Sequence, residues 1–143
     1  MNAELYNLSY LQEVFQGNDA MVRRILDLFE VQVPGYFDEM ESRLAHGQWR
    51  QLHPLAHKAK SSLGMLGMEG VLYHTLHIET VSRSGLQPED IPERLRAARA
   101  ALDLAMAALS TDRDRLHLIR DARTEGKTHG KSSLDSGRGL KRA

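Results

Sequence analysis

One of the seven histidines in this 143-residue chain, His57, has neighbours that could support chemistry. Lys60 follows it by three residues, so the two side chains lie on the same side if this segment is a helix. An imidazole is mostly neutral near pH 7, and its free nitrogen can then act as a nucleophile. A nearby ammonium group can stabilise negative charge on whatever the ring holds. The pair is therefore the candidate reactive site of the chain.

The predicted helix around His57, residues 48–66, separates this pair from its apolar side. At 100° per residue, His57 lies roughly 140° from the direction of the apolar residues. Those apolar residues, which we expect to be buried, are Leu52, Leu55, Ala56, Ala59, Leu63 and Leu66. On the solvent side we expect a surface that we call the His57 ridge, made of Arg50, His53, His57, Lys60, Ser61 and Gly64.

The His57 ridge is basic, and no carboxylate lies within one turn of His57 on this face. No side chain on this helix could therefore act as a base partner for the imidazole. This argues against hydrolytic catalysis and suits a carrier, because an exposed neutral imidazole needs no strong activation. Gly64, two turns beyond His57, adds no side chain that would obstruct a docking partner.

The rest of the chain is punctuated as helices, with nothing that predicts strands. Ser9 and Gln12 form a predicted capping box at the first helix, Gly17 ends it, and Asn18 or Asp19 caps the next. Glycines also mark helix ends at positions 47 and 85. The predicted helices are residues 9–17, 18–47, 48–66, 68–83 and 92–110. Within the second, we expect Pro34 to produce a kink or a local break.

Short connections between amphipathic helices favour antiparallel neighbours. We therefore predict an all-α fold, an antiparallel up-down-up-down four-helix bundle with a short N-terminal lid helix. The length suits a single domain. The absence of cysteine excludes disulfides and thiolate chemistry, and no run of 18 apolar residues predicts a membrane span. We expect a cytoplasmic protein.

Charge and composition change near residue 111. Residues 1–111 contain 10 Lys and Arg against 14 Asp and Glu, whereas residues 112–143 contain 9 against 5. We interpret residues 1–111 as the bundle and residues 112–143 as a basic tail. About the last 20 residues hold too few apolar side chains to offset their conformational entropy, and we expect them to be disordered. The net positive charge of the basic tail is modest, and no aromatic residues lie among its basic ones. We therefore do not predict nucleic-acid binding.

Residues 56–67, AHKAKSSLGMLG, resemble the signature of histidine-containing phosphotransfer (HPt) domains. In that signature Ala-His is followed by Lys at three residues and Gly at ten, as Lys60 and Gly67 follow His57. Phe29 and Glu79 also stand where such domains commonly place these residue types. Ser61 departs from the Gly often found after the lysine, and Pro54 lies one turn before His57. The resemblance covers about residues 8–110.

The resemblance implies that His57 accepts a phosphoryl group from a receiver-domain aspartate and passes it to another. Lys60 would stabilise the charge of the phosphoryl group. Arg50, His53, Ser61 and Gly64 would dock the partner. The implied partners are response-regulator receiver domains and a hybrid sensor histidine kinase. The chain would be a phosphoryl carrier rather than a stand-alone enzyme, with no cofactor of its own and magnesium supplied by the receiver.

Two alternatives remain open at this stage. The first is a helical-bundle protein-binding module without phosphotransfer. The second is a metal site, because His53 and His57, and likewise His74 and His77, have spacings that can place two ligands on one helix face. Metal sites in bundles point inward with supporting carboxylates, whereas we expect His53 and His57 to point outward, so we predict no metal. For Glu79 we favour a boundary carboxylate that is hydrogen-bonded within the bundle.

Overall fold

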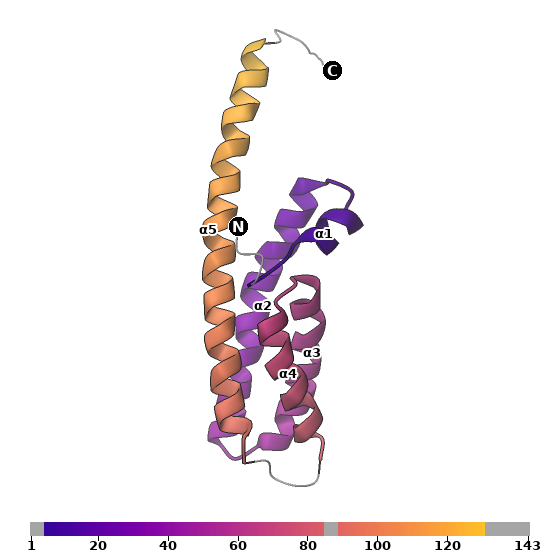
Figure 1. Ribbon diagram of the computed structural model, residues 1–143, viewed down its shortest axis with the longest axis vertical. Coiled ribbons are helices and arrows are strands. Elements are labelled where there is room, and N and C mark those ends of the chain that lie inside the picture. The colour runs from indigo at the N-terminus through magenta and orange to yellow at the C-terminus, as the bar shows by residue number, and fades with distance from the viewer. Residues whose placement is uncertain (1–4, 85–88, 131–143) are drawn as a thin grey trace. The chain divides into compact units, whose positions relative to one another are not determined.

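The computed structural model describes residues 5–84 and 89–130, with side chains as far as Asp114, and every regular element in this part of the chain is helical (Figure 1). This confirms the all-α class, while the up-down-up-down order stays a prediction. The elements are α1 (Ser9–Val14), α2 (Asp19–Ala45), the 3-10 turn η1 (Trp49–Gln51), α3 (Leu52–Met65), α4 (Glu69–Ser82) and α5 (Ile91–Gly130).

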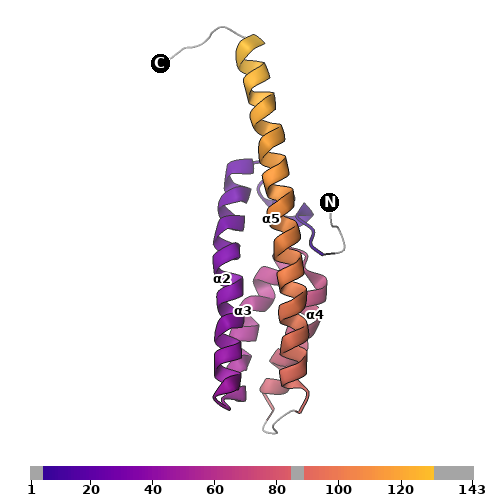
Figure 2. The ribbon, with the colours of Figure 1, turned by 90° about the vertical axis from the view of Figure 1, so that its left-hand side faces the viewer.

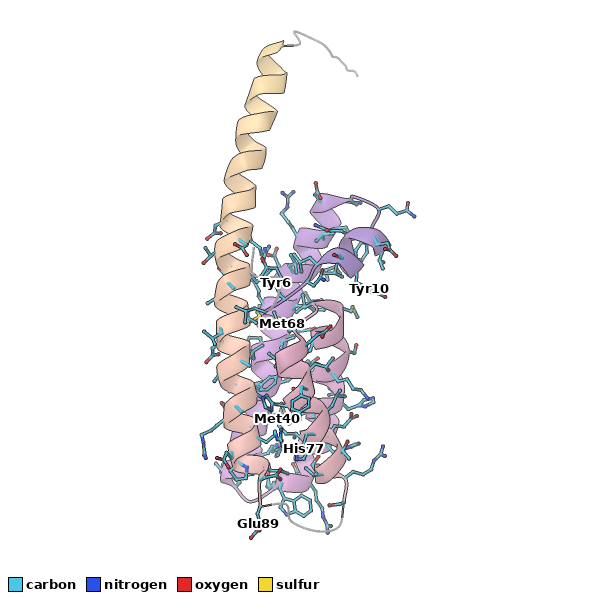
Figure 3. The ribbon with its side chains drawn as sticks, viewed as in Figure 1. Tyr6, Tyr10, Met40, Met68, His77 and Glu89 are labelled. Atoms are coloured by element: carbon cyan, nitrogen blue, oxygen red, sulfur yellow. The ribbon has the colours of Figure 1, made fainter. Side chains whose placement is uncertain are left out.

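The core is built from the apolar side of each helix, and α3 packs against both α2 and α4 (Figure 2). The expected buried residues of α3 are all buried, from Leu52 to Leu66. In α2 the spacing of three and four residues places Phe29, Val33, Phe37 and Met40 in the core. Figure 3 shows Met40 and Met68 among the packed side chains between the helices. The burial pattern predicted for the helix around His57 is therefore confirmed.

Helix ends follow the predicted signals with one correction. Asn18 caps α2, since its Oδ1 accepts from the amide of Met21 at 3.1 Å. Gly17 and Gly47 have positive φ values of 78° and 73°, as expected of residues that end helices. The capping box at Ser9 is wrong: Ser9 is the first residue of α1, and its amide donates to Asn7 Oδ1 at 2.9 Å.

The two prolines inside predicted helices have different outcomes. The helix α2 is continuous through Pro34, so of the kink or local break that we expected, the break is absent. Packing on both sides of the proline holds this helix together, because Val33 and Phe37 are fully buried. Pro54 lies in the first turn of α3, where a missing amide donor costs little. The α-helix accordingly starts at Leu52, after η1, and not at residue 48.

The final helix extends further than we expected. The chain divides into two compact units, Met1–Leu109 and Ser110–Ala143, and α5 continues to Gly130. Residues 124–130, which we expected to begin the disordered tail, are therefore helical. Glu125 and Lys127 favour a helix, but the two glycines and two threonines of this stretch do not, so local propensity does not explain the extension. Residues 131–143 and Gly85 lie outside the described residues, and the boundary predicted after residue 111 stays a prediction.

Within the described ranges, no helix combines the length and apolar character needed to cross a membrane.

Candidate functional site

His57 lies on the outer side of α3 with a well-defined partner from another helix. Its side chain is 63% exposed, which confirms the solvent-facing position predicted from the helical pattern. Its Nδ1 is 2.6 Å from Oε2 of Glu79 on α4. The ring is thus held from its inner side and presented to solvent on the other.

Glu79 connects His57 and Lys60. Its side chain is only 12% exposed, and both of its carboxylate oxygens lie 3.1 Å from Lys60 Nζ. Burial by itself would raise the pKa of Glu79, but the hydrogen bonds and charges of His57 and Lys60 outweigh burial and lower that pKa below its usual value. Glu79 is therefore an anion at neutral pH, and it bridges the two basic groups of the site.

The bond to Glu79 determines where the proton of the His57 ring lies. An ionised carboxylate only accepts hydrogen bonds, so Nδ1 must carry the proton that it donates. In the neutral ring the other nitrogen, Nε2, then holds a lone pair. The Glu79 carboxylate, as the acceptor of this bond, also restricts the orientation of the His57 ring. Whenever the ring is neutral, the arrangement therefore presents an oriented nitrogen with a lone pair at the surface of the molecule.

The sequence analysis found no base partner for His57 on its own helix, and the carboxylate that meets the ring comes from a second helix. The helical pattern covers only side chains on α3, whereas Glu79 comes from α4 and lies 22 residues further along the chain. Glu79 is hydrogen-bonded at the edge of the bundle, as we favoured, and in that position it also touches the candidate reactive ring. No signal within residues 48–66 could have identified it, and the family resemblance singled out Glu79 without assigning it to His57.

The remaining residues of the His57 ridge are accessible, with one exception. Ser61, Gly64 and Arg50 are exposed, and a Cβ added at Gly64 would meet nothing within 4 Å. The guanidinium of Arg50 lies over the ring of Trp49, 5.3 Å from its centroid. These positions leave room for a partner protein around His57. Their docking role stays a prediction.

The exception is His53, which does not point freely outward as we expected. It is half-buried, and its Nδ1 lies 2.8 Å from the backbone oxygen of Glu79. Its ring is stacked on that of His57 with centroids 6.4 Å apart and an interplanar angle of 27°. The physical reason is that the first turn of α3 lies beside the last turn of α4, where helix carbonyls need donors.

The two other motif positions have structural roles. Phe29 is buried in the core. Gly67 ends α3 with φ of 64°, and a Cβ there would lie 2.7 Å from backbone atoms of Asn7. The close approach is needed because the amide of Asn7 donates to Leu66 O at 2.9 Å. Gly67 thereby lets the segment before α1 cross the end of the helix that carries His57.

The second predicted histidine pair is engaged in side-chain bonds between α4 and the start of α5. His77 Nε2 lies 2.7 Å from Asp90 Oδ2, and Arg94 donates to His74 Nδ1 at 3.3 Å. Figure 3 places His77 toward the end of the bundle where the labelled Glu89 lies. Among the residues that the structure describes, no group of three or more His, Cys, Asp or Glu side chains could hold a metal ion.

Comparison with known proteins identifies a family for most of the bundle. The family model described as Hpt domain matches residues 24–112, which include α3, α4 and the His57 ridge. No curated protein and no solved structure matches the chain significantly.

Proposed function

The chain belongs to the Hpt domain family, a family of histidine phosphotransfer in phosphorelays, and from this premise we propose that His57 is its phosphoryl-accepting residue. The observation that carries the proposal is the contact between His57 Nδ1 and Glu79 at 2.6 Å on a ring that is 63% exposed. The phosphoryl donor is an aspartyl phosphate on a receiver domain. A second receiver aspartate is the final acceptor.

The proposed step forms one bond and breaks one. The lone pair of Nε2 attacks phosphorus in line, the bond from phosphorus to the aspartate oxygen breaks, and the aspartate leaves as a carboxylate. The imidazole becomes positively charged while it retains its proton on Nδ1. Glu79 already accepts that proton's hydrogen bond, so its negative charge offsets the new positive charge on the ring. The reverse step delivers the phosphoryl group to the second aspartate.

Lys60 supplies positive charge close to the oxygens of the transferred phosphoryl group. Its side chain is 36% exposed and lies on the same face as His57, so the ammonium can turn toward the phosphoryl oxygens while it remains close to Glu79. Catalysis of phosphoryl transfer consists mainly of positioning and charge neutralisation. The receiver domain would bring the magnesium ion and most of that neutralisation. The chain then acts as a phosphoryl carrier rather than as a stand-alone enzyme.

The proposed partners are receiver domains of response regulators and of a hybrid sensor histidine kinase. They would cover the exposed part of the His57 ridge, where Gly64 leaves open space and Ser61 is small. Arg50 adds positive charge at the start of this surface. The proposal includes the cytoplasm as the site of this exchange, as the sequence analysis predicted.

A labelled phosphotransfer experiment tests the proposal. A receiver domain carrying a 32P-labelled aspartyl phosphate is mixed with the chain, and the label is followed over time in acid-labile and base-stable form. Wild-type protein should take up label and His57→Gln should take up none. His46→Gln is the matched control, because His46 is an exposed histidine just after the end of α2, with its Nδ1 2.7 Å from Ser42 O and away from the site.

The same experiment distinguishes a phosphoryl carrier from the alternative, a binding module. A helical binding module without phosphotransfer would bind receivers but remain unlabelled in the wild type. Label on His57→Gln equal to that on the wild type would equally exclude His57 as the acceptor. The melting temperature of His57→Gln should stay close to that of the wild type, because exposed substitutions typically change stability by about 0.5 kcal/mol or less.

A further inference from the structure

His53, one turn before His57, is bonded to the same residue that holds the His57 ring. His53 Nδ1 lies 2.8 Å from the backbone oxygen of Glu79, and His57 Nδ1 lies 2.6 Å from a side-chain oxygen of Glu79. A carbonyl oxygen only accepts, so the Nδ1 of His53 carries the proton in this bond. Two histidines of α3 therefore donate to one residue of α4, one to its backbone and one to its carboxylate.

The backbone oxygen of Glu79 needs a donor from outside its own helix. Since α4 ends at Ser82, the amide that would usually reach this oxygen is that of the capping residue Arg83, and the backbone bond described at this helix end goes to Val81 O instead. The hydroxyl of Ser82 lies 3.3 Å from this oxygen, but its shorter bond, 2.6 Å, is to Ile78 O. Within the described residues, His53 is thus the short-range donor that reaches this carbonyl from another helix.

The position of this carbonyl bears directly on the reactive ring. The end of a helix frays easily unless its carbonyls find partners. If the last turn of α4 moved by even an ångström, the 2.6 Å contact between Glu79 and His57 would lengthen and lose most of its strength. By holding the backbone of Glu79 against α3, His53 keeps the carboxylate in reach of His57.

We propose that His53 is a positioning residue for phosphotransfer: by bonding the backbone of Glu79 it maintains the Nδ1-protonated form of His57 and leaves Nε2 free to attack. This inference rests on the proposed function of His57 and deepens it. His53 touches neither the phosphoryl group nor the attacking nitrogen. Its ring is half-buried, so this role differs from the docking role that the sequence suggested.

Two substitutions separate the donor of His53 from the bulk of its ring. His53→Asn places an amide N–H close to where Nδ1 lies, and therefore keeps the donor but loses the ring. His53→Phe keeps a ring that can stack on His57 and loses the donor. His46→Phe is the matched control, since it removes another bond from a histidine Nδ1 to a helix carbonyl, that to Ser42 O, away from the site.

Two measurements are made on the full chain. Long-range 1H–15N NMR spectra report which nitrogen of the neutral His57 ring carries the proton. Phosphoramidate, a small phosphoryl donor, labels histidine without a receiver, so its rate reports the chemistry of His57 apart from docking. His53→Phe should shift His57 toward the Nε2-protonated form and slow labelling by about threefold to tenfold, the effect of losing one neutral hydrogen bond. His53→Asn and His46→Phe should stay within about twofold of the wild type, because neither removes that bond.

The outcomes distinguish the inference from the proposed function. If wild-type His57 is not labelled at all, the proposed function fails. If the wild type is labelled and His53→Phe matches it in both measurements, the positioning role of His53 is refuted. Equal impairment of His53→Phe and His53→Asn would also refute it, because the donor would then not be the cause. Should His53→Phe melt early, the Asn variant still decides, since it must retain the wild-type rate and protonation.

Discussion

Removing the carboxylate of Glu79 is the most informative perturbation of this site, because Glu79 contacts both His57 and Lys60. Two substitutions grade the loss. Glu79→Gln keeps the shape and one oxygen that can accept from His57, but removes the charge. Glu79→Ala removes the acceptor altogether. We expect phosphotransfer to fall in the order wild type, Glu79→Gln, Glu79→Ala.

The magnitudes follow from the kind of bond that each variant retains. A hydrogen bond to a charged group contributes about 1.5–3 kcal/mol, and a neutral one about 0.5–1.5 kcal/mol. Exchanging one for the other in Glu79→Gln should cost about 1 kcal/mol, which is roughly fivefold in rate. Glu79→Ala should cost about tenfold or somewhat more, toward the lower end of a charged bond, because the 63% exposed ring of His57 can partly bond to water instead.

The assay measures labelling of His57 by phosphoramidate and by a phosphorylated receiver, each over a time course. Asp90→Asn is the matched control, because it weakens a similar histidine–carboxylate contact, 2.7 Å between His77 and Asp90, away from His57. Urea unfolding of each variant separates chemistry from stability, since the Glu79 side chain is only 12% exposed. Wild-type rates in a folded Glu79→Ala protein would refute the assignment of Glu79 as the partner of the reactive ring.

Four further outcomes are expected. Lys60→Ala should slow transfer to His57 by about tenfold to a hundredfold where its contact to the phosphoryl oxygens is fully formed in the transition state, as timed labelling would show. Gly64→Leu should weaken receiver binding in titrations yet leave phosphoramidate labelling unchanged, because a side chain there meets only open space on the protein itself. Gly67→Ala should lower the free energy of unfolding by about 1–3 kcal/mol, measured as a lower urea midpoint. The reasons are the positive φ of residue 67 and the 2.7 Å approach of an added Cβ to Asn7. Burial, Arg94 and His77 lower the pKa of His74 below its usual value of 6.5. The unfolded chain therefore binds more protons than the folded one, and stability should fall as the pH drops below about 6.5. His74→Gln should flatten this dependence of the urea midpoint on pH.

The sequence by itself determined the helices and the outward position of His57. Both depend on local spacing, because a period of 3.6 residues separates the buried side of α3, including Leu52 and Leu63, from the side that carries His57 and Lys60. The cap at Asn18 and the helix end at Gly47 are likewise local, since their bonds and backbone angles involve residues a few positions apart.

Only the tertiary structure decided which side chains surround the reactive ring. Glu79 is 22 residues from His57 in the chain, and its carboxylate reaches His57 because α4 packs beside α3. Because of the same packing, His53 lies against a carbonyl at the end of α4 and not in the solvent-exposed position that its spacing predicts. A helical pattern specifies the direction of a side chain relative to its own axis, but not the neighbouring helix, whose rotation and register are set by the packing of the whole core.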